Sequence, residues 1–514
     1  MKMENFFIST AISYTNGPPH MGHAYEVIAA DVIARFNRLR GKKVFFLTGT
    51  DEHGLKVQQK AENLNITPDK LAYDMSQNFI KMSKKLNCSN DDFIRTSEER
   101  HKNAVRDIWQ RMEKNGDIYL GKYSGWYSIV DEAFYQEGEL KKNEKDEYVS
   151  PNNNAVEWVD ENSYFFKLSN YEDKLLNLYE ENEFFIQPKS RINEIRNFVK
   201  NGLNDISISR KGLEWGIKVP NDPEHSIYVW VDALTNYISA LNWPNENDDR
   251  FKSFWPADLH LIGKDITRFH AVYWPAFLLS AGIEIPKKIF AHGFILNKGE
   301  KMSKSLGNIE DPMELIDTFG VDQLRYFLMR EAVFGNDGNY SDELLINRVN
   351  SDLSNDLGNL SQRCLSMVKK HCNSKVPEKN NLNDIDQKLL NLPEDKINKI
   401  FEMMDKFQIN SYIEEVFNIV SLTNKYFSDQ KPWELKNNDL MRMQSVLWVT
   451  VEMIRRISIM LQPVMPESCK RLLDLLCIKD DERALSFISD EFSLTPGKAI
   501  KEPVIIFPKI EYKN

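Results

Sequence analysis

Two short polar motifs, far apart in the chain, carry residue types suited to phosphate chemistry. They read Pro18-Pro19-His20-Met21-Gly22-His23 and Lys301-Met302-Ser303-Lys304-Ser305. Imidazoles and free main-chain amides at a helix start can donate hydrogen bonds to phosphate oxygens. Gly22 would let a flat base approach the backbone, and lysines on a glycine-bounded loop can neutralise a departing pyrophosphate. The two motifs together predict a site for a nucleoside triphosphate.

Each motif follows a segment that reads as a buried strand. Residues 5–12 are followed by a turn and by apolar positions at helical spacing that end at Gly41. Residues 44–48 form a second apolar run, which leads into the polar loop 49–54, and residues 287–296 lead into the second motif. This order predicts an α/β fold with a doubly wound, Rossmann-like parallel sheet, whose ligands lie beyond the carboxyl ends of the strands.

Taken singly, each motif has a simpler interpretation. His20 and His23 could be a pair of helix-capping histidines, and the lysine segment could be a solvated basic turn. A Walker loop is excluded, because the chain has no G-x-x-x-x-G-K-[ST] segment.

The two motifs, in this order, resemble the HIGH and KMSKS signatures of class I aminoacyl-tRNA synthetases. Four further stretches narrow the resemblance to the methionyl-tRNA synthetase family, over nearly the whole chain: residues 11–23, 48–54, 228–233 and 263–270. The resemblance implies an enzyme that condenses methionine with ATP, as its magnesium complex, to methionyl-adenylate and pyrophosphate. The methionyl group then passes to the terminal adenosine of tRNA(Met).

The same resemblance implies a role for individual residues. The catalytic residues would be His20, His23, Lys301 and Lys304, and ATP would contact Gly22, Lys264, Asp265 and Lys304. Methionine would contact Ala11, Ile12, Tyr14, Asp51, Trp230, Ala233, Leu234, Tyr237, Ile266 and His270, with Asp51 holding its ammonium group. The anticodon would be read by Asn359, Arg363 and Trp433. Aromatic rings suit a thioether, because sulfur beside a ring gains about 0.3 to 1.5 kcal/mol.

The sequence pattern divides the chain into five segments. Residues 1–115 and 225–320 read as the two halves of the catalytic domain, separated by an α+β insertion at residues 116–224. A junction at residues 321–345 precedes long helical patterns, so we expect a helical bundle over residues 346–514. By the resemblance, the insertion is the connective peptide and the bundle binds the anticodon. Many family members bind zinc through cysteines of this insertion; it has none here, so no metal site is expected.

The composition of the chain indicates how it contacts RNA and in which cellular compartment it acts. The chain of 514 residues has a formal net charge of -10, so contacts with RNA must come from local clusters. One candidate cluster comprises Lys189, Arg191, Arg196, Lys200, Arg210 and Lys211. The chain has no long apolar run, begins almost at once with a strand, and has five cysteines without a C-x-x-C pair. We therefore expect a cytoplasmic protein with reduced thiols, no membrane segment and, without an appended domain, a monomer.

Two other functions are compatible with parts of the pattern. A smaller nucleotidylyltransferase can share the H-x-G-H signature, although the helical third of the chain would then have no task. A non-catalytic tRNA-binding paralogue could keep the fold, although His20, His23 and Lys304 are intact.

Overall fold

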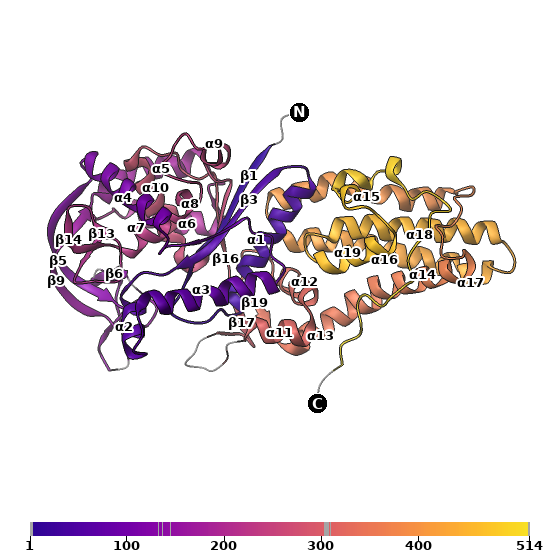
Figure 1. The fold of residues 1–514 in the computed structure, drawn as a ribbon, viewed down its shortest axis with the longest axis horizontal. Coiled ribbons are helices and arrows are strands. Elements are labelled where there is room, and N and C mark those ends of the chain that lie inside the picture. The colour runs from indigo at the N-terminus through magenta and orange to yellow at the C-terminus, as the bar shows by residue number, and fades with distance from the viewer. Residues whose placement is uncertain are drawn as a thin grey trace.

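A computed structural model describes residues 4–131, 133–135, 137–143, 145–302, 308 and 310–511. The molecule is elongated, with a sheet-containing half at one end and a bundle of helices at the other (Figure 1). The predicted combination of a doubly wound α/β domain and an all-α domain is confirmed.

The central sheet of the first half is built from parallel strands. Their order is β10-β16-β15-β1-β3-β2, with β4 also paired to β3. In β3 every residue after Lys43 is buried, which is typical of a parallel strand covered on both faces. The strands are β1 (Asn5–Thr10), β2 (Ser13–Tyr14), β3 (Lys43–Asp51), β4 (Asp92–Arg95), β10 (Ile186–Gln187), β15 (Leu259–Gly263) and β16 (Ile289–His292).

Helix α1 (Met21–Leu39) lies between β1 and β3 in the chain and begins directly after the first motif. Every residue from Val27 to Ala34 is buried, so the middle of this helix is covered on all sides, and Gly41, at φ 87°, ends it as predicted. The other helices before the insertion are α2 (Leu55–Asn63), α3 (Pro68–Lys85) and α4 (Glu99–Lys114).

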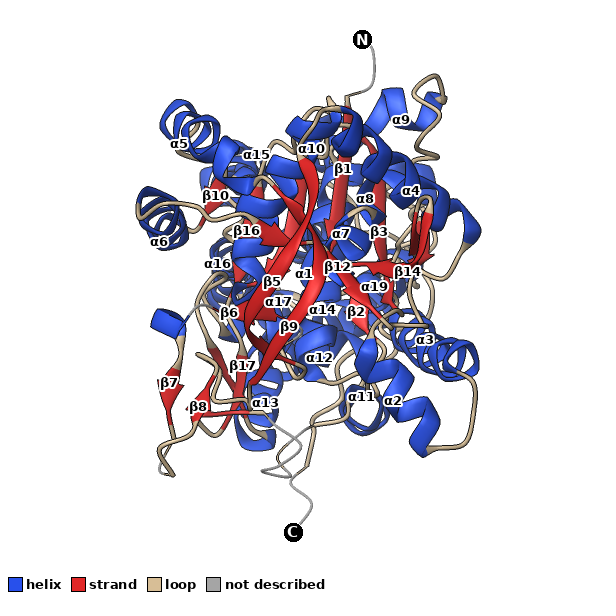
Figure 2. Ribbon diagram, turned by 90° about the vertical axis from the view of Figure 1, so that its left-hand side faces the viewer, coloured by secondary structure: helices blue, strands red, loops and turns tan. Residues whose placement is uncertain are grey.

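The insertion is dominated by the long antiparallel strand pair β5 (Ile118–Ser128) and β9 (Glu157–Phe166), seen crossing in front of the central sheet in Figure 2. Its short strand β10 pairs with β16, so the insertion supplies an edge strand of the central sheet. The remaining elements are β6 (Ala133–Tyr135), η1 (Glu137–Glu139), β7 (Lys141–Lys142), β8 (Tyr148–Val149), η2 (Leu168–Tyr171), α5 (Glu172–Glu181), α6 (Lys189–Lys200), β11 (Ile206–Ser207), β12 (Ser209–Lys211), β13 (Lys218–Val219) and β14 (Asp222–Ile227).

After the insertion, the chain returns to the central sheet through β15 and β16. The other elements of this part of the chain are α7 (Val229–Leu234), α8 (Asn236–Ser239), α9 (Asp249–Phe254), η3 (Lys264–Ile266), η4 (Phe269–Tyr273), α10 (Trp274–Ala281), β17 (Ile295–Asn297) and β18 (Glu300–Lys301). The connection to the bundle comprises α11 (Pro312–Phe319), α12 (Val321–Glu331), β19 (Gly338–Tyr340), α13 (Asp342–Arg348) and the π-helical η5 (Val349–Gly358).

The bundle is organised around α18 (Leu440–Leu461), which is buried on all sides from Ser445 onward. Such a helix is expected at the centre of a bundle rather than on its surface. Around it lie α14 (Asn359–His371), α15 (Asp384–Asp405), α16 (Ile409–Gln430), α17 (Pro432–Leu435) and α19 (Pro466–Leu475), followed by η6 (Asp480–Glu482), η7 (Leu485–Ile488) and η8 (Asp490–Phe492).

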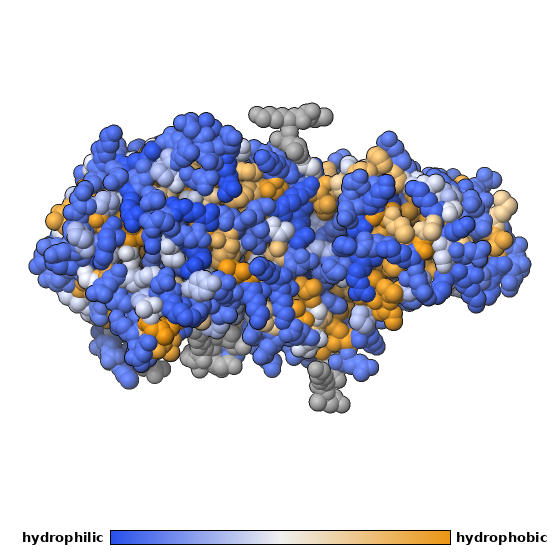
Figure 3. Space-filling model, viewed as in Figure 1, coloured by the Kyte–Doolittle hydropathy of each residue, from blue (hydrophilic) through white to orange (hydrophobic). Residues whose placement is uncertain are grey.

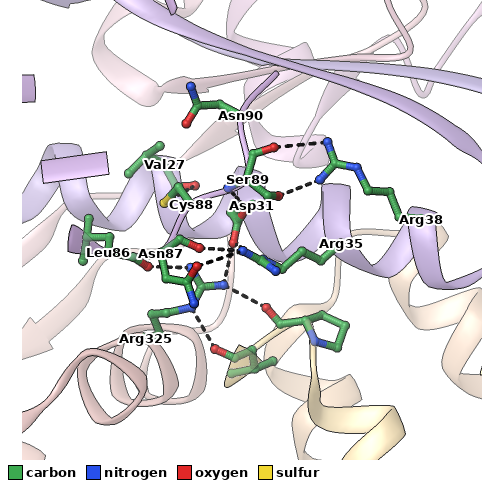
Figure 4. Close-up of polar contacts among 12 residues, drawn as sticks. Val27, Asp31, Arg35, Arg38, Leu86, Asn87, Cys88, Ser89, Asn90 and Arg325 are labelled. Atoms are coloured by element: carbon green, nitrogen blue, oxygen red, sulfur yellow. Dashed lines mark hydrogen bonds and ion pairs between the residues drawn. The ribbon is translucent and has the colours of Figure 1, made fainter. Parts of the chain in front are cut away.

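The two halves are joined by a buried polar network around Arg325 of α12 (Figure 4). Its guanidinium donates to Asp31 Oδ2 of α1 at 2.7 Å and to the carbonyl oxygens of Leu86, Pro463 and Val464. Arg325 and Asp31 are fully buried. Since Pro463 and Val464 follow α18, this one side chain ties the helix that begins at the first motif to the bundle.

The face of the molecule in Figure 3 is mostly hydrophilic, with its apolar side chains in scattered patches. Among the described residues, no helix combines the length and the apolar character that crossing a bilayer would require.

Candidate active site

The carboxyl ends of four parallel strands meet at one edge of the central sheet, and each is followed by predicted site residues. Strand β1 leads to His20, β3 ends at Asp51, β15 leads to Lys264, and β16 ends at His292 and leads toward Lys301. The strand order changes direction at β1: one of its parallel neighbours is β3, and the other is β15 from the distant second half. Ligands of doubly wound sheets bind at such a position.

His20 and His23 form a capping box at the start of α1. Gly22 N donates to His20 Nδ1 and His20 N donates to His23 Nδ1, each at 3.1 Å. A ring nitrogen that accepts from an amide bears no proton, so each neutral ring has its proton on Nε2. Burial and then the neighbouring His20 lower the pKa of His23 well below its ordinary value. With ring centroids 3.8 Å apart, the pair offers two adjacent N–H donors.

Gly22 packs closely against His20 of its own motif. A Cβ atom built at this position would lie 3.0 Å from His20 Cε1 and 3.1 Å from Nδ1. A side chain here would therefore require the His20 ring to shift by a few tenths of an ångström. Two separate reasons therefore favour glycine at this position: its packing against His20, and the close approach of a base that the sequence predicts.

Lys264 and Asp265 follow β15 and both fold back against the protein. Lys264 Nζ lies 2.6 and 2.8 Å from the two carboxylate oxygens of Asp337, which also accepts from Phe294 N. The Asp265 carboxylate lies over Gly263, where a Cβ would come within 2.7 Å of Oδ1. The sequence did not indicate Asp337, because it lies on a distant loop before β19.

A second unpredicted pair bridges α1 and β16 beside the histidines. Glu26 Oε2 lies 2.9 Å from His292 Nε2, and His292 Nδ1 donates to Gly293 O. Burial raises the pKa of Glu26. Burial alone would lower the pKa of His292, but its hydrogen bond to Glu26 outweighs this effect, so the pKa of His292 is also raised. A small cleft in front of this pair is lined by Thr10, Ser13, His23, Glu26 and Thr48.

The second motif begins on a β-hairpin next to these strand ends. Lys301 pairs with Leu296 in the β17–β18 ladder, and β17 also pairs in parallel with β19. Lys304 lies outside the described residues. Strand β18 with Lys301 thus follows the end of β16, at the edge that also holds His20 and His23.

Tyr237 and His270 form a fully buried hydrogen-bonded pair. Their Oη and Nε2 atoms lie 2.7 Å apart, and His270 Nδ1 lies 3.1 Å from Ile266 O. A carbonyl only accepts, so Nδ1 carries the proton and Nε2 accepts from Tyr237. Burial lowers the pKa of His270 to about 4. His270 lies in the π-helical η4, a type of turn often found at functional sites.

Most of the other predicted methionine-contacting residues belong to, or pack against, the same apolar cluster as Tyr237. Leu234 is buried in the same apolar cluster, and Ala11, Ile12, Trp230 and Ile266 pack against it. Trp230 stacks on Phe269 with ring centroids 3.6 Å apart, and Ala233 is buried. Tyr14 differs, because it packs in a separate small cluster with Val57, Ala61 and Trp215.

Asp51 ends β3 opposite Tyr14 in the parallel β2–β3 pair. Its carbonyl accepts from both the amide and the hydroxyl of Thr15, and its side chain is largely buried. The adjacent Glu52 is fixed by Arg95, whose Nε and Nη2 lie 2.7 and 3.0 Å from the two carboxylate oxygens. The site therefore has a buried carboxylate on a rigid strand end.

In the bundle, the structure brings Asn359, Arg363 and Trp433 together. Asn359 and Arg363 are one turn apart at the start of α14, directly after η5. The Arg363 guanidinium lies over the Trp433 ring at 5.1 Å, and Trp433 meets Phe427 edge to face at 5.9 Å. Trp433 is partly buried, so it both packs on the bundle and presents part of its ring.

The basic residues of the insertion lie on two separate elements, and half of them form local ion pairs. Residues 189–200 lie on α6, whereas Arg210 and Lys211 lie on β12. Arg191 pairs with Glu194, Arg210 with Glu161 and Lys211 with Glu224. Local pairing thus neutralises much of the charge that the sequence suggested for RNA.

Sequence reasoning missed the aromatic and polar partners that complete the site. Phe269, Trp215, Glu26, His292 and Asp337 each contact a predicted residue or its strand end. Phe269 could have been predicted, because it precedes His270 in a stretch that resembles the family. Asp337 could not, because it lies in no such stretch.

Comparisons with known proteins agree along the whole chain. The family model "tRNA synthetases class I (M)" matches residues 6–365, and "Anticodon binding domain of methionyl tRNA ligase" matches residues 376–514. A methionine–tRNA ligase of Brucella suis is 52% identical, with 99% of this chain and 98% of that protein covered. One from Rhizobium meliloti is also 52% identical, with 98% of each covered.

Solved structures give the same result. Mycobacterium tuberculosis methionyl-tRNA synthetase in complex with methionyl-adenylate is 48% identical and matches with a TM-score of 0.96, covering 98% of this chain and all of that one. The apo form of that enzyme gives 0.90 at 44% identity, with 99% of each chain covered. The chain therefore belongs to the methionyl-tRNA synthetase family of class I aminoacyl-tRNA synthetases and is an ATP-dependent enzyme that joins methionine to tRNA.

Proposed function

We propose that this edge of the sheet holds methionine and ATP side by side and that the predicted residues act there in the roles given by their positions. The convergence of four strand ends that carry His20, Asp51, Lys264 and the start of the Lys301 segment carries the proposal. In the first step, a methionine carboxylate oxygen attacks the α-phosphorus of ATP, and the bond to pyrophosphate breaks. In the second, a hydroxyl of the terminal ribose of tRNA attacks the methionyl carbonyl, and AMP leaves.

The phosphates lie against the start of α1. The Nε2–H groups of His20 and His23 donate to phosphate oxygens, and the positive end of the helix dipole favours the same anion. Lys301 and Lys304 neutralise the departing pyrophosphate. ATP enters as its magnesium complex, with the ion held mainly by phosphate oxygens and water.

The remaining ATP contacts come from Gly22, Lys264 and Asp265. The ion pair with Asp337 holds the Lys264 ammonium near the end of β15, so that it meets the nucleotide from the side opposite α1. Gly22 keeps the approach to the helix start open because its Cα bears no side chain.

The methionine thioether lies in the apolar cluster around Tyr237. Trp230, Leu234 and Ile266 enclose it, with Ala11, Ile12, Tyr14, Ala233 and His270 completing the contacts. A neutral His270 suits this role, since a charged imidazole beside a thioether would be buried without an anion. The Asp51 carboxylate binds the methionine ammonium group.

The bundle reads the anticodon through Asn359, Arg363 and Trp433. An exposed amide, a guanidinium and a partly exposed indole suit unstacked bases, which proteins recognise by stacking and by hydrogen bonds to base edges. Residues 346–514 would then act as the anticodon-binding domain, and residues 1–115 and 225–320 as the catalytic domain around the insertion at 116–224, with a junction at 321–345.

The protein acts in the cytoplasm as a monomer. Its five cysteines are free thiols, which suits a reducing compartment. Light scattering coupled to size-exclusion chromatography tests the monomer: a mass near 60.0 kDa is expected, and twice that value would contradict it.

Amino-acid-dependent exchange of pyrophosphate into ATP tests the proposed chemistry. The full chain is assayed with each of the twenty amino acids in turn, without tRNA. Exchange with methionine alone is expected from the apolar pocket. Equal exchange with leucine or isoleucine would contradict the assignment of Tyr237 and His270 to a thioether pocket.

A further inference from the structure

A buried carboxylate, Asp232, joins three separate elements of the catalytic half. It lies on α7 between Trp230 and Leu234 and is 1% exposed. Its Oδ2 lies 2.7 Å from His53 Nδ1 at the end of β3, and its Oδ1 lies 2.7 Å from His101 Nε2 of α4. The bond to His53 spans 179 positions of sequence.

Both oxygens of Asp232 are used inside the protein. An ionised carboxylate only accepts hydrogen bonds, so each imidazole donates to it. Burial alone would raise the pKa of Asp232, but the two imidazoles outweigh this effect and hold it at about 2. The second nitrogen of His101 lies 2.9 Å from Ser239 Oγ, so that ring is fixed at both ends.

The segment that His53 anchors is the one that carries Asp51. On its other side, Trp215 Nε1 donates to Glu52 O, and the Trp215 ring meets the His53 ring at 5.2 Å. The Glu52 side chain is held by Arg95. Residues 51–53 are thus clamped between the β4 side of the sheet and α7.

The element that Asp232 belongs to carries a wall of the proposed pocket. Trp230 and Leu234 lie on the same short helix, and Trp230 stacks on Phe269. Asp232 therefore fixes the distance between the strand end with Asp51 and the helix with Trp230, although it is itself too deeply buried to lie in the pocket.

We infer that Asp232 is a positioning residue for methionine binding, which holds the Asp51 strand end and the Trp230 helix at the separation that fits the amino acid. The inference rests on the proposed roles of Asp51 and Trp230. Neither His53 nor His101 needs to touch a substrate for it to hold.

The substitution Asp232→Asn tests the inference. Asparagine has nearly the same shape but one acceptor oxygen, so it cannot accept from both imidazoles. Loss of one charge-assisted hydrogen bond predicts that the methionine KM in pyrophosphate exchange rises about 10- to 100-fold. The KM for ATP should stay within about twofold, because the start of α1 is not involved. A parallel rise of both KM values, or a fall in kcat alone, would overturn the inference.

Asp386→Asn is a matched control in the bundle. Asp386 is also fully buried and accepts from Arg442 and Tyr426. We expect this variant to melt at a lower temperature while its methionine KM stays at the wild-type value. If it shifted the methionine KM as strongly as Asp232→Asn, general destabilisation would explain both and the inference would fall.

A second pair of variants keeps the test decisive if Asp232→Asn does not fold. His53→Phe removes the donor, whereas His53→Asn can restore it, because an asparagine amide reaches a position close to Nδ1. A raised methionine KM in the first and recovery in the second support the inference, and equal losses in both contradict it.

Asp51→Ala separates this inference from the proposed function. If that variant leaves the methionine KM unchanged, the proposed role of Asp51 fails and the inference fails with it. If Asp51→Ala raises the methionine KM and Asp232→Asn does not, only the inference fails.

Discussion

Removal of one oxygen atom, in Tyr237→Phe, should selectively weaken methionine binding. Tyr237 donates to His270 Nε2 at 2.7 Å, and both residues are buried. Phenylalanine keeps the ring and its stacking on His260, whose centroid lies 3.9 Å away. The substitution leaves a buried acceptor on His270 unsatisfied, at a cost of about 1 to 3 kcal/mol. That cost corresponds to about 5- to 140-fold in an equilibrium constant.

Steady-state pyrophosphate exchange shows whether the lost hydrogen bond changes the methionine KM, the ATP KM or kcat. We expect the methionine KM to rise within this range while the ATP KM and kcat change little, because the hydrogen bond orients the pocket and does not contact the phosphates. Tyr412→Phe is a control, since Tyr412 is buried in the bundle and its hydroxyl donates to Met460 O. A folded Tyr237→Phe protein with an unchanged methionine KM would refute the role of the pair in methionine binding.

Three further predictions test other parts of the site. Lys304→Ala should slow adenylate formation by about 10² to 10³ and leave methionine binding nearly unchanged, and an unaltered exchange rate would exclude its role. Trp433→Ala should impair tRNA charging but spare pyrophosphate exchange, whereas equal losses would indicate a folding role. Because the pKa of His270 is about 4, below its ordinary 6.5, the ring is neutral in the folded protein. The methionine KM should therefore be flat from about pH 6 to 8. A methionine KM that changes near pH 6.5 would contradict a neutral His270. The stability that His270 contributes should be lost as pH falls from 6.5 toward 4.

The strand ends were predictable because local sequence determines them. Buried apolar runs give the strands, the polar residues after Thr10 and Gly263 follow from where those runs stop, and parallel topology then forces these ends to one edge. The capping geometry of His20 and His23 likewise follows from their spacing at a helix start. The residues proposed to contact phosphate could therefore be placed at this edge without coordinates.

Contacts between segments that are far apart in the sequence could not be predicted in the same way. Asp31 and Arg325 are 294 positions apart, and nothing in the periodicity of either helix indicates a shared ion pair. The pairing of β10 with β16 is similar, since two residues inside the insertion give too weak a strand pattern to assign to the main sheet. Tyr14 was grouped with the other pocket residues by resemblance, and its packing in the small cluster that also includes Trp215 had no signal in the sequence.

A crystal structure with a non-hydrolysable methionyl-adenylate analogue tests the proposed arrangement of the whole site. We expect a phosphate oxygen within hydrogen-bond distance of the Nε2 atoms of His20 and His23. We also expect the analogue's ammonium group to contact Asp51 and its thioether to lie among Trp230, Tyr237 and His270. An analogue bound with its phosphate away from the start of α1, or with its side chain outside the Tyr237 cluster, would contradict this arrangement.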